Sequence, residues 1–294
     1  MTIRFSVVVP CYNEESYLAD AIRSLQRQDF DGAYEIVVVD NNSTDATAEI
    51  ARGLGVRVVT EPVPGVCNAR QAGTEASSGE IVVSTDADTT HAPDWLAKID
   101  RNFRAGDHVV AVVGPCRYKD GPRWGRGFAR TLFGAVGTVY RVTGRTCYVS
   151  ATNIAFRRDR WSAYDTTLTQ GGDELDVLRR LRRQGTVVYD KTNPTFTSGR
   201  RFARGLVYNV FVSLFLFYLS AYFVNRLFGR RVLGSAPAYR DSRPAFTRRF
   251  RVAVAGALVA LSLLAFDKPR EYIAHAHDDV VNYVQGPPVD SSDR

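Results

Sequence analysis

The sequence predicts an α/β fold in which a doubly wound, mixed sheet is followed by helices associated with a membrane. Short runs rich in valine and isoleucine alternate with segments of helical periodicity through the first 90 residues. This alternation is typical of parallel strands joined by helical crossovers. Polar and acidic residues follow each run at the point where a strand would end, and long apolar segments occur only after residue 200.

Four strands are predicted in the first half, and the first two are short apolar runs, as expected of strands buried on both faces. The four strands lie at residues 5–9, 35–40, 56–61 and 81–85. Pro10 ends the first strand, and Asn13 is the predicted N-cap of the helix that follows it. Ser43 or Thr44 caps the second helix, and residues 68–76 form the third.

The pattern is less regular beyond residue 89. Helices are predicted within residues 95–103, 119–146 and 174–185, and strands at residues 109–118, 148–158 and 186–190. Gly185 is the expected C-terminal stop of the last helix.

Composition places the chain among ordinary globular proteins with a modest basic excess. The 294 residues are 45% hydrophobic and 23% charged, and the net charge is +7. This excess could serve nucleic acid, anionic lipid or phosphorylated substrates. Together with the motifs described below, it leads us to expect membrane lipids and a phosphorylated substrate as partners, and no nucleic acid. The four cysteines have no metal-ligand spacing, so we expect four separate thiols in a reducing compartment. No secretory signal is visible at the N-terminus.

Two aspartates one residue apart, Asp86 and Asp88, follow the predicted strand at 81–85. In an extended chain alternate side chains share a face, so both carboxylates would point into one space. Two hard oxygen donors there suit Mg²⁺ or Mn²⁺, ions that are usually shared with substrate phosphates. The alternative is a polar turn after a strand.

Three further loops are expected at the same edge of the sheet. In the first, Tyr12 would stack on a nucleotide base and Glu14 would accept from ribose hydroxyls. In the second, Asp40 would accept from a base N–H, while Asn42 tolerates a tight turn. In the third, Arg70 would lie near phosphates or a base edge. The alternatives are a helix cap, a plain turn and a solvated surface arginine.

The order of these loops resembles the family 2 glycosyltransferases of GT-A fold. The segments that carry the resemblance are P-x-Y-N-E at 10–14, V-V-V-D-N-N-S-T-D at 37–45, A-R at 69–70 and D-A-D at 86–88. It implies a Rossmann-like nucleotide-binding half and an inverting transferase of the hexosyltransferase class. The donor would be a UDP- or GDP-linked sugar, with a divalent cation on Asp88 and with Asp86 serving the cation or the ribose.

The resemblance extends more weakly to about residue 201. Residues 171–185 lie where the family carries a Gly-Glu-Asp stretch whose Asp is the catalytic base, but here Asp173 precedes Glu174. By position Glu174 takes the place of the base, and Asp173 is the alternative. A third interpretation is that both acids complement a helix N-terminus. The nucleotide-sugar-binding residues implied are Pro10, Tyr12, Glu14, Asp40, Asn42, Arg70, Asp86, Arg200 and Arg201.

Arg200 and Arg201 resemble a Ser-x-Arg-Arg patch that would clamp the departing diphosphate or, as an alternative, contact the membrane.

Two apolar runs predict membrane association. Residues 206–224 would form a helix roughly 28 Å long, close to the ~30 Å thickness of the hydrocarbon layer, and residues 252–266 form a second run. We expect helices in or on the cytosolic leaflet, with the intervening arginines on anionic lipid; a two-helix hairpin is the alternative. The predicted regions are a GT-A domain at 1–201 (nucleotide-sugar half 1–115, acceptor half 116–201), a membrane-associated region at 202–270 and a polar tail at 271–294.

The sequence thus predicts an inverting, metal-dependent glycosyltransferase at the cytoplasmic face of the cell membrane, acting on a lipid-linked or cell-envelope glycan acceptor. One alternative is a polyprenyl-phosphate glycosyltransferase that needs no general base. Another is a non-catalytic, membrane-bound nucleotide-sugar-binding protein, which the reversed acid pair favours. A nucleotidyltransferase and a dinucleotide-binding oxidoreductase are disfavoured because no glycine-rich phosphate loop follows the first strand.

Overall fold

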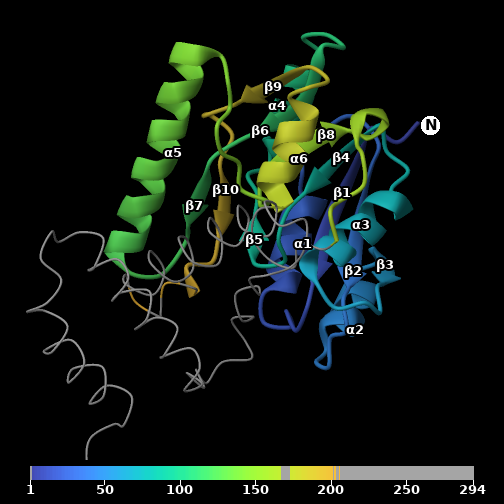
Figure 1. Cartoon of the computed structure of the whole chain (residues 1–294). Helices are drawn as coiled ribbons and strands as arrows, with labels where there is room; N and C mark the ends of the chain where they lie inside the picture. The colour runs from blue at the N-terminus through green and yellow to red at the C-terminus, as the bar shows by residue number, and fades with distance from the viewer. Residues whose placement is uncertain (1, 167–172, 201, 203–204, 206–294) are drawn as a thin grey trace, which may run out of the picture. The chain divides into compact units, whose positions relative to one another are not determined.

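The computed structural model describes residues 2–166, 173–200, 202 and 205, all of which fall within one compact unit, Met1–Ala236. Their main sheet has the strands β1 (Phe5–Cys11), β2 (Tyr34–Asp40), β3 (Arg57–Thr60), β4 (Ile81–Ser84), β6 (Val109–Val113), β8 (Ile154–Arg157) and β9 (Thr186–Tyr189). The strand order is β3-β2-β1-β4-β8-β6-β9 (Figure 1). Only β8 runs antiparallel to its two neighbours. The predicted α/β class with a mixed sheet is therefore confirmed.

A second, smaller sheet was not predicted. It has the order β5-β10-β7, in which β10 (Thr195–Thr197) pairs antiparallel with β5 (Thr89–Thr90) and parallel with β7 (Cys116–Tyr118). The prediction of one strand over residues 109–118 is wrong, because β6 ends at Val113 and β7 belongs to this second sheet. Pro115 has no N–H to donate to a ladder, and it lies where the chain leaves one sheet for the other.

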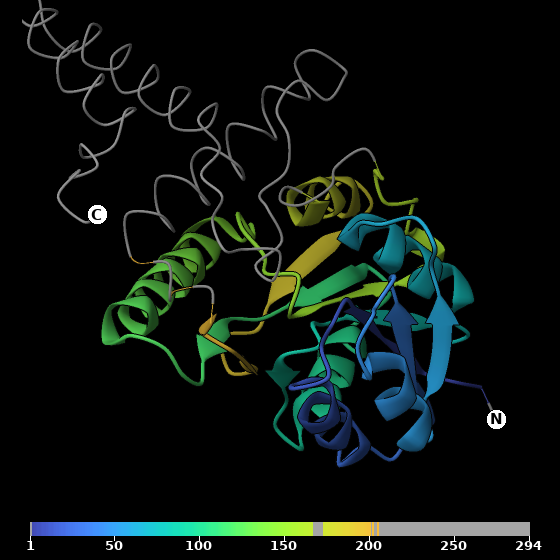
Figure 2. The ribbon, with the colours of Figure 1, turned by 90° about the horizontal axis from the view of Figure 1, so that it is seen from below.

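Helices cover both faces of the main sheet. They are α1 (Leu18–Gln26), α2 (Thr47–Gly53), α3 (Val66–Ala76), α4 (Trp95–Phe103), α5 (Arg123–Thr143) and α6 (Asp173–Leu181). Apolar residues of α1, α2 and α4 form one buried cluster with the sheet, and those of α3, α5 and α6 form the other. Figure 2 shows yellow α6 on one side of the strands and dark blue α1 on the other. Val7 and Val8 belong to different clusters, as alternation along a strand requires.

The predicted helix caps Asn13, Ser43 and Thr44 are wrong. Helices α1 and α2 begin later than predicted, at Leu18 and Thr47, and neither has a side-chain cap. Instead, the backbone N–H of Thr44 donates to Oδ1 of Asn13 at 2.8 Å, and that of Asn13 donates to Oγ of Ser43 at 3.0 Å. These short polar side chains join the two loops after β1 and β2. The hydrogen bonds between the loops take up the side-chain groups that would otherwise cap the helices.

Two predicted ends of elements are also wrong. Pro10 lies inside β1, which tolerates it because β4 pairs with β1 only as far as Val8. Helix α6 ends at Leu181 rather than at Gly185. Gly185 instead allows its backbone to pass close to that of His108, since a Cβ at Gly185 would lie 2.5 Å from the carbonyl oxygen of His108. The other predicted elements are present, although β8 begins only at Ile154.

Helix α3 packs closely on the main sheet through Gly73. A Cβ at this position would lie 2.4 Å from Cγ1 of Val8 and 2.8 Å from Cγ2 of Val39. Because only glycine fits there, α3 lies directly on β1 and β2. Arg70, about one helical turn earlier, is brought by this contact to the edge of the sheet, where it is 4% exposed.

The predicted membrane segments, 206–224 and 252–266, and the polar tail lie outside the described residues. No helix in the described part of the chain has the length and apolar character needed to cross a bilayer. No disulfide joins Cys11, Cys67, Cys116 and Cys147, as the sequence predicts.

Candidate functional site

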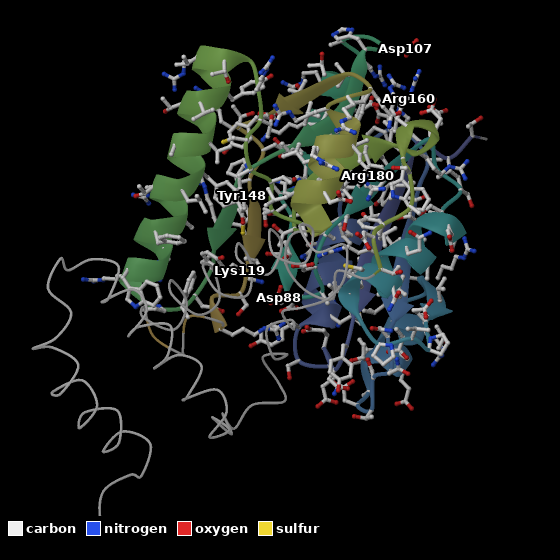
Figure 3. All side chains as sticks on the ribbon, viewed as in Figure 1. Asp88, Asp107, Lys119, Tyr148, Arg160 and Arg180 are labelled. Carbon is white, nitrogen blue, oxygen red and sulfur yellow. The ribbon has the colours of Figure 1, made fainter. Side chains whose placement is uncertain are left out.

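The carboxyl ends of three parallel strands define the candidate site. Strands β1, β2 and β4 are in register as neighbours, so their ends lie at one edge of the main sheet. Helix α1 leaves β1 on one face and α3 reaches β4 over the other, which opens the sheet edge between the two strands. Figure 3 shows Asp88 toward this edge, whereas Asp107 and Arg160 lie at the opposite one.

An arginine lies between two acids at this edge. The guanidinium of Arg200 donates to both carboxylate oxygens of Glu14, at 3.0 and 2.7 Å, and its Nη2 is 2.9 Å from Oδ2 of Asp88. Both acids are buried, with Glu14 9% and Asp88 7% exposed. The ring of Tyr17 covers the guanidinium, with 4.6 Å between Cζ and the ring centroid. We call these four residues the Arg200 cluster.

The Arg200 cluster keeps its arginine charged. Burial alone would lower the pKa of Arg200. The hydrogen bonds to Glu14 and the negative charges of Asp88 and Glu14 outweigh burial and raise that pKa above its ordinary value. Three predicted site residues, Glu14 of the first loop, Asp88 of the D-A-D segment and Arg200 of the segment after β10 (Thr195–Thr197), therefore form one charged unit.

The two aspartates of the D-A-D segment have different partners. Oδ1 of Asp86 accepts from Nη2 of Arg70 at 3.0 Å, whereas Oδ1 of Asp88 accepts from Oγ1 of Thr197 at 2.9 Å. The expected extended chain is absent, because the N–H of Thr89 donates to the carbonyl of Asp86 and closes a turn. The pair therefore lies at the sheet edge, but on a turn rather than on one face of a strand.

The backbone before Arg200 is held by Asp120, a residue that the sequence did not indicate. The N–H of Gly199 and the hydroxyl of Ser198 donate to the Asp120 carboxylate. The N–H of Ser198 also donates to the carbonyl of Asp88 at 3.2 Å. A Cβ on Gly199 would lie 2.4 Å from the Asp120 carbonyl oxygen, so the two loops touch through backbone. An Asp-Gly turn is the only signal that could have indicated Asp120.

The remaining predicted nucleotide residues line the loops after β1 and β2. Tyr12 is 37% exposed, so one ring face can be covered by a ligand. Asp40 is buried at the end of β2, where an oxygen accepts from the N–H of Ser43 at 3.2 Å. Asn42 has φ of 65°, which confirms the predicted tight turn. Pro10 lies one residue before the end of β1.

The structure does not describe the side chains of three predicted site residues. Asp173 and Glu174 open helix α6, and their side chains lie outside what the structure describes, as does the whole of Arg201. Helix α6 is joined to β9 by a short turn at the amino edge of the sheet and packs against it. Its first residues therefore face the carboxyl edge, where Asp88 lies.

A buried histidine, His91, contacts Thr85, the residue just before the D-A-D segment. Nε2 of His91 lies 2.9 Å from Oγ1 of Thr85, Nδ1 lies 3.2 Å from Oγ of Ser24, and the ring packs on Trp95 with centroids 4.0 Å apart. Burial, with a smaller contribution from the charge of Lys119, lowers the pKa of His91 to about 3. The imidazole is therefore neutral near pH 7 and serves as a structural hydrogen-bonding group.

The buried thiol of Cys116 lies within the electrostatic influence of Asp86 and Asp88. Burial and the charges of Asp86 and Asp88 raise the pKa of Cys116 to about 12, against the opposing effect of hydrogen bonds with Thr152 and Thr195. Because the thiolate is the nucleophilic form, Cys116 is unsuited to covalent catalysis.

The donor set fits Mg²⁺ or Mn²⁺ shared with a substrate. Among the described residues, no three His, Cys, Asp or Glu side chains gather into a complete protein cage for a metal ion. Ions of this kind commonly take one or two protein carboxylates and the rest of their ligands from phosphates and water. Asp88 and Asp86 can supply those carboxylates. The guanidinium between Glu14 and Asp88 shows that this position already favours positive charge.

Comparison with known proteins agrees with this geometry. Residues 6–161, more than half of the chain, match the model described as glycosyl transferase family 2. An uncharacterised glycosyltransferase of Mycobacterium tuberculosis is 39% identical over 105 residues, covering 36% of this chain and 46% of the relative. The undecaprenyl-phosphate 4-deoxy-4-formamido-L-arabinose transferase of Edwardsiella ictaluri is 35% identical over 155 residues, covering 49% and 46%. The chain thus spans less than half the length of either relative.

Solved structures share the fold. Glucosyl-3-phosphoglycerate synthase from Mycobacterium tuberculosis in complex with phosphoglyceric acid has a TM-score of 0.50 and 26% identity, over 69% of this chain and 74% of that one. The same enzyme in complex with Mn²⁺, uridine diphosphate and glucosyl-3-phosphoglycerate has a TM-score of 0.51 at 22% identity, over 80% and 82%. The mixed sheet is consistent with the GT-A glycosyltransferase fold.

We predict that stability falls on acidification because of His91. Between pH 6.5 and about 3 the unfolded chain binds a proton that the folded His91 does not. The stabilisation is therefore complete above pH 6.5 and declines below it by about 1.4 kcal/mol per pH unit, or ~2 kcal/mol by pH 5. Chemical denaturation between pH 5 and 7.5 measures this slope. His91→Gln should reduce it, and the exposed His108 provides the control, since His108→Gln should keep it. An equal slope in all three proteins would contradict the prediction.

Proposed function

Because the chain belongs to the family 2 glycosyltransferases, we propose that it transfers a sugar, with inversion, from a UDP- or GDP-linked donor to a lipid-linked or cell-envelope glycan acceptor. The observation that carries the proposal is the Arg200 cluster at the carboxyl edge of β1 and β4. Cleavage of a sugar–phosphate bond leaves a diphosphate whose charge must be stabilised, and this edge holds both cationic and metal-ligating groups.

The described loops suit the parts of a nucleotide. Tyr12 is exposed for stacking on the base, and Asp40 lies at the end of β2 for a base N–H. Glu14 would accept from the ribose hydroxyls once Arg200 releases it. Arg200 would then contact the diphosphate, because a guanidinium pairs with phosphate oxygens through two parallel hydrogen bonds. Arg70, held by Asp86, contributes positive charge beside them.

We propose that Asp88 holds a Mg²⁺ or Mn²⁺ ion and that Asp86 contributes to the ion or to the ribose. When bound, such an ion neutralises charge on the departing diphosphate. Asp88 suits this role because it is buried and its carboxylate already contacts a cation. Asp86 is 27% exposed at its side chain and is oriented by Arg70, so it remains open toward the sheet edge.

Proton transfer depends on the acceptor. For a hydroxyl acceptor, we propose Glu174 as the general base and Asp173 as the alternative, since helix α6 begins with these two residues at the end nearer the carboxyl edge of the sheet. For a polyprenyl phosphate acceptor, the attacking oxygen is already ionised near neutral pH, and no base is needed. The relatives named undecaprenyl-phosphate transferases favour this second candidate.

We also propose that the enzyme works at the cytoplasmic face of the cell membrane. Support comes from the apolar runs at 206–224 and 252–266, from the arginines between them and from the lipid acceptor named for the relatives.

We predict that, in intact cells, a cysteine introduced as Arg240→Cys in a Cys147→Ser background resists a membrane-impermeant maleimide and reacts after lysis. Labelling in intact cells would instead favour the two-helix hairpin.

We predict that Asp88→Asn lowers sugar transfer by at least about 100-fold, the scale of losing one electrostatic stabiliser of the transition state. The matched control is Asp107→Asn, an exposed aspartate at the opposite edge. Transfer is measured with radiolabelled UDP- and GDP-sugars and with polyprenyl phosphate or glycan acceptors. A thermal-shift panel of UDP and GDP with Mn²⁺ identifies the nucleotide first, because a saturating ligand raises stability by roughly 3 kcal/mol at 100 times its Kd. Binding without any transfer or hydrolysis would favour the non-catalytic alternative.

The two acids at the start of α6 allow a separate prediction. If a hydroxyl acceptor is used, Glu174→Gln should lower kcat by about 100-fold or more, while Asp173→Asn has a smaller effect. Single-turnover rates with saturating donor report this difference. Full activity in both variants would rule out a general base here and leave the polyprenyl phosphate acceptor as the explanation.

A further inference from the structure

We infer that Arg200 is an internal counter-ion that occupies the place of the divalent cation until a nucleotide diphosphate draws it away. The cation and the nucleotide would then bind together, and the cation alone would bind weakly. This inference rests on the proposed function and adds to it an order of binding.

The first step is the charge balance of the ligand-free site. Glu14 and Asp88 are buried, and the same guanidinium contacts both. Without a cation, two neighbouring buried carboxylates would repel each other. No opposite charge would then offset the free energy that each of them loses on leaving water. Arg200 supplies the missing charge from a side chain that is itself only 16% exposed.

The second step is that a metal ion and this guanidinium compete for Asp88. Oδ2 of Asp88 lies 2.9 Å from Nη2 of Arg200, and Oδ1 accepts from the hydroxyl of Thr197. A Mg²⁺ or Mn²⁺ ion at an ordinary bond length of about 2.1 Å from Oδ2 would lie against the guanidinium. A metal ion and a guanidinium in contact with the same carboxylate oxygen repel each other strongly. Arg200 must therefore move away from Asp88 before the ion can bind there tightly.

The third step is the destination of the guanidinium. Nε of Arg200 is buried and has no hydrogen-bond partner among the described residues, so one of its donors is unused. A diphosphate offers several acceptor oxygens for a planar guanidinium. The hydroxyl of Ser198 and the backbone N–H of Gly199 both donate to Asp120, which holds the chain just before Arg200, so we expect the arginine side chain rather than its backbone to move.

The consequence is a thermodynamic coupling. A nucleotide diphosphate that takes up Arg200 frees Asp88 for the ion and Glu14 for the ribose. Because binding linkage is reciprocal, Mn²⁺ should strengthen nucleotide binding by the same factor by which the nucleotide strengthens Mn²⁺ binding.

The test is Mn²⁺ binding to the full-length protein, followed by the electron paramagnetic resonance of free Mn²⁺, without nucleotide and with UDP or GDP. For the wild type, the nucleotide should tighten Mn²⁺ binding at least tenfold. Arg200→Gln should bind Mn²⁺ alone at least tenfold more tightly than the wild type and should lose most of the enhancement by nucleotide. The matched control is Arg104→Gln, which removes an arginine paired with Asp100 on α4. It should behave as the wild type.

The outcomes separate this inference from the proposed function. If the wild type binds neither UDP nor GDP in the presence of Mn²⁺, the proposed function fails and the inference fails with it. If it binds them, but Mn²⁺ affinity is the same in the wild type and Arg200→Gln and does not respond to nucleotide, only the inference is overturned. Should Arg200→Gln not fold, Arg200→Met replaces it. Methionine removes the positive charge and keeps an unbranched side chain, so Mn²⁺ alone should again bind more tightly, and unchanged affinity would overturn the inference.

Discussion

The ion pairs of Arg200 connect the first loop of the chain to the last described strand. Glu14 and Arg200 are 186 positions apart, and Asp88, which lies between them in sequence, contacts the same guanidinium. Glu14 and Asp88 come from the ends of β1 and β4 in the main sheet, whereas Arg200 follows β10 of the small sheet. The hydroxyl of Thr197 on β10 and the backbone of Ser198 also bond to Asp88. The two sheets therefore meet at the charged residues of the candidate site, and the site depends on both.

Such a buried charge arrangement is weak evidence for stability, since desolvation can cost more than the ion pairs return. An apolar replacement could pack in the same place but could not exchange one cation for another, so the arrangement fits a functional role. Asp120 supports this interpretation. Its carboxylate accepts from the hydroxyl of Ser198 and the backbone N–H of Gly199. The guanidinium of Arg200 is held separately, by Glu14, Asp88 and the ring of Tyr17.

The valine-rich runs allowed the strands of the first half to be predicted, because buried parallel strands need little besides continuous apolar side chains. The polar loops after β1, β2 and β4 were also predicted at one edge, since parallel register leaves no other arrangement. The hydrogen-bond partners of individual polar side chains were not predictable. Asn13 and Ser43 bond between loops, where a cap was expected, and Pro115 directs the chain into a second sheet. Tyr17 and Asp120 carry no motif, and the bond between Arg200 and Glu14 depends on contacts far apart in sequence.

We assign the side chains that the structure describes at this site to the sugar donor. How the donor's diphosphate is stabilised and whether the acceptor needs a general base are therefore two separate questions, and the reversed order of Asp173 and Glu174 bears on the second. In the mechanism we propose, Asp88, Arg200 and a cation stabilise the departing diphosphate whatever the acceptor is, because the charge develops on the same leaving group. A base is required only if the acceptor oxygen carries a proton that must be removed. With a phosphate acceptor, the order of Asp173 and Glu174 has no catalytic consequence, and either acid at the start of α6 would complement the helix dipole equally well. The departure from the family's order at these positions is therefore evidence about the acceptor rather than about whether the donor site works.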